Sequence, residues 1–138
     1  MIPEPELLEA WQRDKADIHG YRLVAEAAVA FEYRGPQFGH PSNYSAIKIV
    51  ATPSPNLCLE SVAIYPSSVT TRYAHQLLLA VGRAAVDELF AGWYPYRCKL
   101  VVDEVGWDEI MSSELAIYRA ARGALSKLRQ EGKWELII

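Results

Sequence analysis

The sequence predicts an α+β fold, a two-layer sandwich in which helices cover one face of a mostly antiparallel sheet. Residues 21–33 and 44–52 alternate apolar and polar side chains, as half-buried antiparallel strands do. Residues 70–91 and 113–128 instead repeat apolar side chains at helical spacing, and each repeat forms a stripe that packs on a sheet. With a further strand before each helix, the order is three strands, a helix, a strand and a helix, which favours two separate layers.

Composition and charge restrict the class of protein. The chain has 138 residues, of which 51% are apolar and 22% charged, a globular balance that fits one domain over residues 1–138. The net charge of −3 gives no overall positive field for nucleic acid, so any such contact is local. No apolar run reaches the roughly 18 residues that span a bilayer, and the N-terminus is acidic, so we expect neither a membrane anchor nor a secretory signal. The two cysteines lie in apolar strand patterns, which favours a reduced, cytoplasmic protein.

The N-terminal half is predicted to begin with a helical extension over residues 1–16, where two prolines suit the first turn. The strand at 21–33 follows. Glycines and prolines then require a loop over residues 34–43 before the strand at 44–52. The two strands are therefore expected to form a long hairpin.

The C-terminal half is predicted to contain a strand at 56–66, the helix at 70–91 and a further strand after Pro95. Gly92 is expected to end the first helix in the left-handed conformation. Residues 133–138 are an optional extra strand after the second helix. The second helix is expected to bury Ala116, Ile117, Ala120, Ala121, Ala124, Leu125 and Leu128.

Three short stretches carry a resemblance to a known family. Residues 92–95 read Gly-Trp-Tyr-Pro at a turn, and residues 111–116 read Met-Ser-Ser-Glu-Leu-Ala where the second helix opens. Residues 34–40 read Arg-Gly-Pro-Gln-Phe-Gly-His between the first two strands. With these motifs, residues 17–128 resemble domain IV of translation elongation factor G, standing alone without the GTPase domain. The resemblance implies the fold of the second domain of a small-subunit ribosomal protein, with a left-handed β-α-β crossover that departs from the usual rule.

In that family the loop between the first two strands and the loop before the second helix form a tip, which enters the decoding region of the small ribosomal subunit. The resemblance implies that the first loop contacts RNA or a partner through Arg34, Gly35, Gln37, Phe38, Gly39 and His40. Pro36 and the added residues 41–43 make this loop stiffer and longer than the family's. An ordinary turn residue is the alternative interpretation of His40.

The second loop departs further, because Asp108 stands where the family has a histidine. Asp103, Glu104 and Glu109 add three more carboxylates, which repel RNA phosphates. A metal site or a general acid/base pair is one interpretation, but the spacing lacks the alternation and the glycine of a calcium loop, and Trp107 indicates a packed tip. We favour a protein-facing acidic tip of Trp107, Asp108 and Glu109, with an exposed Trp107 as the interface anchor.

A basic row on the second helix consists of Arg119, Arg122 and Arg129, which fall near one line away from the apolar stripe. Such a row binds RNA phosphates or an acidic partner, or it is a solvated helix face. His19 and His75 are expected to be ordinary surface residues. The two cysteines, Cys58 and Cys98, either face each other across neighbouring strands or are small buried hydrophobes.

The sequence contains no nucleophile-base pair, no metal-ligand spacing and no phosphate-binding loop. We therefore expect a protein that is not an enzyme and that uses no metal, cofactor or nucleotide. The leading hypothesis is a binding module that contacts the ribosome or another structured RNA. The alternative is a protein-interaction or homodimerisation module that kept the fold and lost the RNA-contacting tip.

Overall fold

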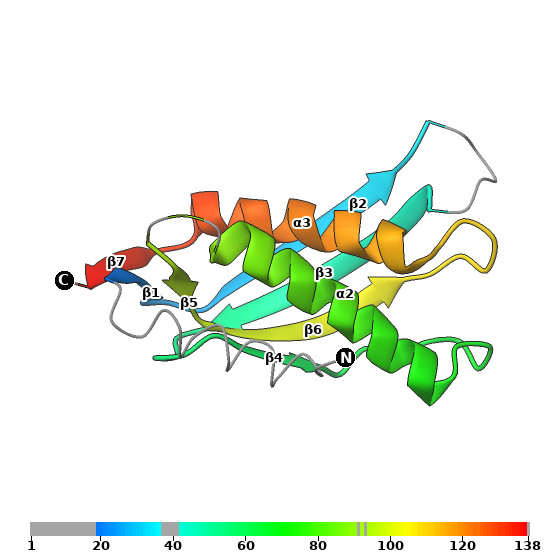
Figure 1. Ribbon diagram of the computed structural model, residues 1–138, viewed down its shortest axis with the longest axis horizontal. Coiled ribbons are helices and arrows are strands. Elements are labelled where there is room, and N and C mark those ends of the chain that lie inside the picture. The colour runs from blue at the N-terminus through cyan, green and yellow to red at the C-terminus, as the bar shows by residue number, and fades with distance from the viewer. Residues whose placement is uncertain (1–18, 37–41, 91, 93, 138) are drawn as a thin grey trace.

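The computed structural model describes residues 19–36, 42–90, 92 and 94–137, and it has the predicted α+β architecture (Figure 1). The helix predicted within residues 1–16 lies outside the described residues. The elements are β1 (Gly20–Leu23), β2 (Ala27–Arg34), β3 (Tyr44–Thr52), β4 (Cys58–Ser61), α2 (Thr71–Leu89), β5 (Tyr96–Arg97), β6 (Lys99–Gly106), α3 (Glu114–Glu131) and β7 (Trp134–Ile137). The main sheet has the order β2-β3-β6-β4, and a smaller end sheet has the order β5-β1-β7.

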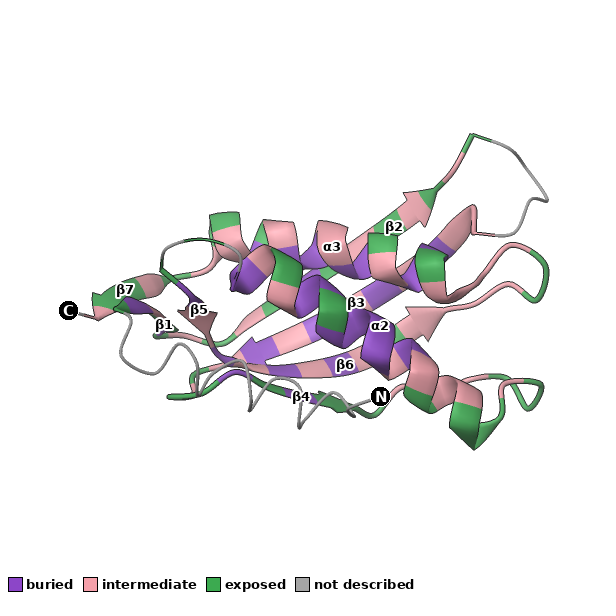
Figure 2. Cartoon of the chain, in the orientation of Figure 1, coloured by how far each residue is buried: buried purple, intermediate pink, exposed green. Residues whose placement is uncertain are grey.

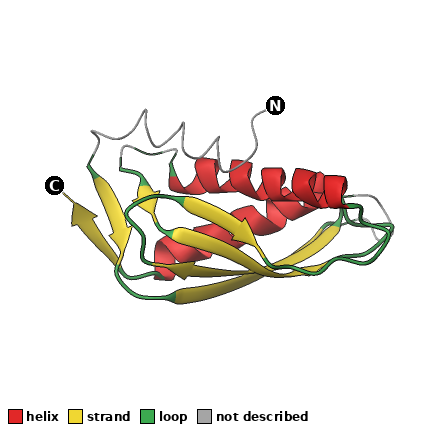
Figure 3. Ribbon diagram, turned by 90° about the horizontal axis from the view of Figure 1, so that it is seen from below, coloured by secondary structure: helices red, strands yellow, loops and turns green. Residues whose placement is uncertain are grey.

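The main sheet is mostly antiparallel, and both helices pack on one of its faces (Figure 3). β3 pairs with β2 and β6 in antiparallel register, whereas β4 and β6 are parallel. The chain passes from β4 to β6 through α2. In Figure 1, α2 lies in front of the sheet and β6, which points to the right, lies above β4. This arrangement is a left-handed β-α-β crossover, as the resemblance implies.

The strand predicted over residues 21–33 is divided between the two sheets. β1 pairs with β7 and β5, whereas β2 pairs with β3. Between them the Val24 N–H donates to the Lys133 carbonyl at 2.9 Å, so the C-terminal segment holds β1 away from the hairpin. The optional strand at 133–138 is thus present as β7. The alternation predicts that residues 21–33 form one strand of a single sheet. The structure has two sheets, because β7 provides β1 with a partner outside the hairpin.

The core lies between the two helices and the main sheet (Figure 2). α3 buries the same seven residues that its sequence pattern predicts. Its first turn is capped by the Ser113 hydroxyl, which accepts from the Ala116 N–H at 3.2 Å. The Thr70 hydroxyl caps α2 in the same way, accepting from the Tyr73 N–H at 3.1 Å. Both helices therefore begin where the sequence signals predict.

Two predicted boundaries are wrong. α2 ends at Leu89, and the N–H of Phe90 closes its last turn. Gly92 lies beyond that end and is not left-handed, so it does not terminate the helix. The strand predicted over residues 56–66 is shorter in the structure, where it is limited to β4. Its pairing with β6 stops soon after β4, and Ile64 beyond it is 91% exposed.

α3 approaches β2 closely at Gly123, where a methyl group would lie 2.4 Å from the ring of Phe31. We expect Gly123→Val to lower the free energy of unfolding by about 1–3 kcal/mol through overpacking, measured by urea unfolding. Gly92→Ala is the control, since nothing lies within 4 Å of a methyl group there, and it should stay within about 0.5 kcal/mol of wild type. A fully stable Gly123→Val would contradict the close approach.

Candidate functional site

Two loops that are distant in sequence meet at one end of the main sheet (Figure 1). The N–H groups of Asn43 and Tyr44 both donate to the Met111 carbonyl, at 3.0 and 3.1 Å. The structure thus brings together the two loops that the resemblance singles out. We call their described residues the composite tip, which consists of residues 34–36, 42–44 and 107–113.

Serine hydroxyls join the two loops a second time. The Ser112 hydroxyl donates to the Tyr44 carbonyl at 2.7 Å and accepts from the Asp108 N–H at 2.8 Å. The hydroxyls of Ser42 and Ser113 lie 2.6 Å apart. Because Ser113 also caps α3, the hairpin loop is attached to the start of that helix. The tip is therefore held in shape by its own hydrogen bonds.

Asp108 shapes the second loop from within. Its Oδ1 accepts from the N–H groups of Ile110 and Met111, both at 2.9 Å. The hydrogen bonds from Met111 and Ile110 lower the pKa of this carboxyl, because they favour its charged form. The Ser112 N–H closes the same turn on the Asp108 carbonyl at 3.0 Å. Asp108 is thus a turn-forming residue, which explains its position better than a metal site does.

The expectation that Trp107 is an exposed anchor is wrong. Its ring packs edge-to-face against Tyr65 and Tyr73, with ring centres 6.0 and 5.8 Å away, and it lies against the core. Burial raises the pKa of Tyr65 to about 12. The apolar side chain that the tip presents to solvent is instead Ile110, which is 67% exposed.

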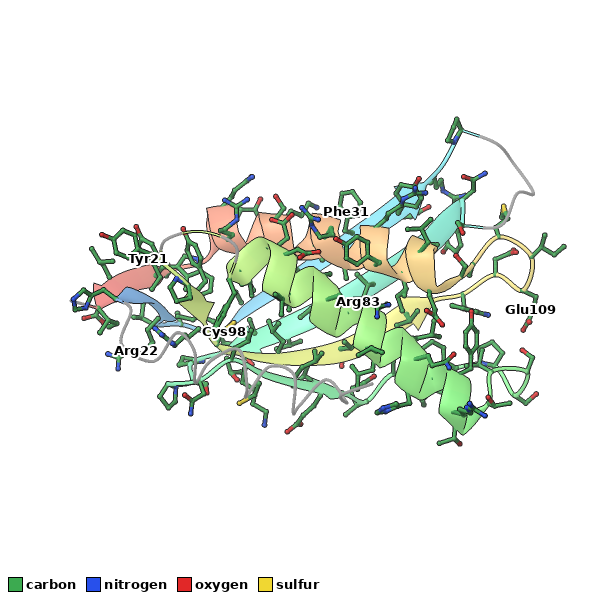
Figure 4. All side chains as sticks on the ribbon, in the orientation of Figure 1. Tyr21, Arg22, Phe31, Arg83, Cys98 and Glu109 are labelled. Atoms are coloured by element: carbon green, nitrogen blue, oxygen red, sulfur yellow. The ribbon has the colours of Figure 1, made fainter. Side chains whose placement is uncertain are left out.

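The carboxylates predicted to form one acidic loop are divided between two places. Glu109 lies at the tip, where it is exposed and accepts a hydrogen bond from the Ser68 hydroxyl (Figure 4). Asp103 and Glu104 lie on β6, and Asp103 pairs with Lys48 at 3.6 Å. Within the described ranges, no group of three or more His, Cys, Asp or Glu residues is placed to hold a metal ion.

Arg34 lies at the base of the first loop. Its guanidinium is 4.8 Å from the ring centre of Tyr44 and forms an ion pair with Glu32, and its side chain is 64% exposed. The Gly35 N–H donates to the Asn43 carbonyl at 2.7 Å, and a methyl group on Gly35 would lie 1.9 Å from Asn43 Oδ1, so a larger residue here would displace the Asn43 side chain. The other predicted contacts of this loop lie outside the described residues, namely Gln37, Phe38, Gly39 and His40.

The basic row predicted on α3 is not a single row. Arg122 and Arg129 turn toward α2, where both donate to Glu88, at 2.6 and 3.3 Å. Arg122 also lies 3.8 Å from the Asp87 carboxylate, and its hydrogen bond to Glu88 raises the pKa of its guanidinium. These two arginines therefore join the helices, and carboxylates already neutralise their charge.

Arg119 turns the other way, toward β2. It donates to the Tyr33 hydroxyl at 3.1 Å and lies 5.3 Å from that ring centre. Lys127, also on α3, has its ammonium 5.8 Å from the ring centre of Phe31. We call Arg34, Arg119 and Lys127 the cationic edge, since all three lie along β2. The sequence pattern missed Lys127, because only tertiary packing reveals that α3 lies beside β2.

The remaining histidines and cysteines are surface or core residues. His19 and His75 are exposed, as predicted. Cys98 is buried, which raises the pKa of its thiol to about 12, and it is the small hydrophobe that one interpretation predicts. Cys58 is exposed, so that interpretation is wrong for it. In the part of the chain that the structure describes, the helices are too short or too polar to cross a membrane.

Comparison with known proteins supports the fold. No protein-family model and no curated protein matches the sequence. The structure is similar to a crystal structure of a protein from Thermus thermophilus, with a TM-score of 0.65 and 22% sequence identity over 86% of this chain. The match covers 18% of that protein, so this chain spans less than a fifth of that protein's length. At this level of identity the likeness shows the fold alone.

The Ser112 hydroxyl makes one hydrogen bond to the first loop, at the Tyr44 carbonyl, and one within its own loop, from the Asp108 N–H, so its removal should loosen the tip. We expect Ser112→Ala to lower the free energy of unfolding by about 1–3 kcal/mol and to speed amide hydrogen exchange at Asn43 and Tyr44. Ser126→Ala is the control, because that hydroxyl accepts a hydrogen bond from the neighbouring Gln130 on the exposed face of α3. Unchanged exchange at Asn43 and Tyr44 in Ser112→Ala would show that the hydroxyl does not hold the tip.

Asp108 should make the tip sensitive to acid. Its pKa is lowered in the folded protein, so its contribution to stability is present above the ordinary value, about 3.9, and is lost as the pH falls through the lowered value. Carbon-detected NMR titration of the Asp108 carboxyl should give a pKa below the ordinary value. Asp108→Asn should lose less stability than wild type between pH 5 and pH 2, roughly the interval in which such carboxylates protonate. A carboxyl that titrates at or above its ordinary value would contradict the two N–H donors.

Proposed function

We propose that the chain is a non-enzymatic binding module that docks through its composite tip, with structured RNA of the small ribosomal subunit as its target. The observation that carries the proposal is the joining of the two tip loops through Met111 and Ser112. The resemblance supplies the target, since domain IV of elongation factor G inserts the same two loops into the decoding region. A tip already held by internal hydrogen bonds loses little conformational freedom on docking.

The cationic edge supports RNA as the target. Arg34, Arg119 and Lys127 each lie over an aromatic ring: Arg34, on β2, over Tyr44 of β3, and Arg119 and Lys127, on α3, over Tyr33 and Phe31 of β2. Cations held in this way at an exposed strand match the repeating charge of a phosphate backbone. Because the chain has a net charge of −3, such contact is confined to this edge and the tip. The target is cytoplasmic, so the proposal includes that compartment.

The second candidate is a protein-interaction or dimerisation module that uses the same tip. It is favoured by Ile110, an aliphatic side chain that is 67% exposed at the end of the molecule. Glu109, next to it in the chain, is also exposed, so the tip presents an apolar group beside an acid. Such a combination suits a protein surface better than a phosphate backbone.

Co-sedimentation with purified small ribosomal subunits at about 50 and about 200 mM salt tests the first candidate. We expect saturable binding that weakens with salt, and Arg34→Ala should weaken it severalfold and reduce the salt slope by about one phosphate contact. Arg22→Ala is the matched control, because Arg22 is also an exposed arginine paired with a glutamate, Glu135, but lies in the end sheet.

Equal loss of binding in Arg34→Ala and Arg22→Ala would mean that charge alone drives association, and the tip would lose its role. Absence of binding by wild type at the lower salt would overturn RNA as the target. The second candidate is then decided by whether Ile110→Asp abolishes self-association in analytical ultracentrifugation or capture of a partner by the wild-type protein.

A further inference from the structure

The main sheet has an unpaired edge along β2. Among the described residues, no strand pairs with the side of β2 that faces away from β3 (Figure 1). β2 pairs with β3 in regular register over its whole length of eight residues, Ala27–Arg34. It is the longest edge strand of the two sheets, since β4 and β7 have four residues each and β5 has two. A long, regular edge strand without proline is a template for a further strand.

The backbone groups of alternate residues of β2 point away from the sheet. Just beyond the strand, the Gly35 N–H donates to the Asn43 carbonyl at 2.7 Å, so the odd-numbered residues of β2 are those that bond to β3. The even-numbered residues, Ala28 and Ala30 among them, therefore direct their N–H and carbonyl groups outward. A contact from α3 agrees with this assignment, because the Lys127 ammonium donates to the Ala30 carbonyl at 3.1 Å. The edge thus offers donors and acceptors in the alternation that a strand requires.

Positive charge lies along the middle and the end of this edge. Arg119 donates to a tyrosine hydroxyl and Lys127 to a backbone carbonyl, so neither forms an ion pair with a carboxylate in the part of the chain that the structure describes. Glu26 precedes the strand and Glu131 lies one helical turn beyond Lys127, so these two carboxylates lie toward the start of β2. Carboxylates on an incoming chain therefore suit the part of the edge beside Arg119 and Lys127.

Two other occupants fit this edge less well. A second copy of the chain, paired through its own β2, would bring two sets of Arg119 and Lys127 together, and like charges repel. RNA phosphates match these cations, but RNA lacks the alternating amide donors and carbonyl acceptors that continue a β-ladder. An extended polypeptide satisfies the backbone groups of the edge, and acidic side chains on it satisfy the two cations.

We propose that the free edge of β2 binds an extended acidic segment of a partner protein, which adds a strand to the main sheet. The new strand would lie about 4.8 Å from β2, beside the flank of α3 that carries Arg119 and Lys127. Its N–H would replace the Lys127 ammonium at the Ala30 carbonyl, and the ammonium would move to a carboxylate of the segment. In the free protein this lysine protects the edge against unspecific pairing, as edge lysines do.

This surface goes beyond the proposed tip function and does not require an RNA target. Both occupants would use Arg119 and Lys127, so a bound strand excludes RNA from this part of the cationic edge. The tip itself stays accessible, because it is formed by the loops at the ends of the strands.

A fluorescein-labelled peptide of about nine residues, in which glutamate alternates with valine and threonine, is a suitable probe, because it matches a strand in length and β-branched residues favour an extended chain. Fluorescence anisotropy should show saturable binding to the wild-type protein. A second probe has the same side chains and carries methyl groups on its central amide nitrogens, so it keeps the charge but cannot donate to the edge. It should bind at least about tenfold more weakly, because several backbone hydrogen bonds are lost.

Amide hydrogen exchange identifies the bound edge without any substitution. The N–H groups of Ala28 and Ala30 point outward, so they should exchange rapidly in the free protein and at least about tenfold more slowly with saturating probe. Val29 and Phe31 are the internal control, because their N–H groups already bond to β3 and should change little.

Two variants separate the backbone from the charge. Ala30→Pro removes an outward N–H without breaking a bond to β3, and Arg119→Glu reverses one cation, so each should weaken binding by about tenfold or more. Their matched controls are Leu136→Pro, at an outward position of the edge strand β7, and Arg72→Glu, at an exposed arginine of α2. The tip variant Ile110→Asp should bind the probe as wild type does, which separates this inference from the tip function.

Absence of saturable binding by wild type, equal affinity for both probes, or unchanged exchange at Ala28 and Ala30 would each overturn the proposal. Equal weakening in Arg119→Glu and Arg72→Glu would also overturn it, because charge alone would then drive association. The exchange measurement decides the matter even where Ala30→Pro lowers stability. These measurements contain no RNA, so their failure leaves the proposed function standing.

Discussion

The close packing of α3 on the main sheet is the constraint on which the rest of the structure depends. Four alanines lie on the buried face of the helix, and Gly123 lets it lie directly against Phe31 of β2. This position determines where Ser113 begins the helix, and therefore where the loop before it meets the hairpin loop. The Ser42 and Tyr44 contacts of the tip follow from that meeting. A helix held further from the sheet would leave the two loops apart.

The same packing determines where the charged side chains of α3 lie. α3 directs Arg122 and Arg129 to the Glu88 carboxylate of α2, while Arg119 and Lys127 lie on the β2 side over aromatic rings. Among the acidic residues, Asp108 forms a turn at the tip. A register shift in the pairing of β3 with β6 places Asp103 and Glu104 on the face of the sheet away from the helices. Arg122 and Arg129 are therefore neutralised between the helices, and the cationic edge remains on the β2 side.

The chain shares its fold with one part of a longer protein. It matches 18% of a longer Thermus thermophilus protein, so the same fold occurs there as one part of a longer polypeptide.

The sequence by itself determined the fold class, the start of both helices and the seven buried residues of α3, because helical periodicity and capping chemistry are local. It also singled out the two loops of the tip. Only the tertiary structure decided that residues 21–33 serve two sheets, that Trp107 is packed and Ile110 exposed, and that the arginines of α3 diverge. Each of these depends on which distant segment lies alongside, and strand pairing and helix packing between distant residues leave no periodic trace in the chain.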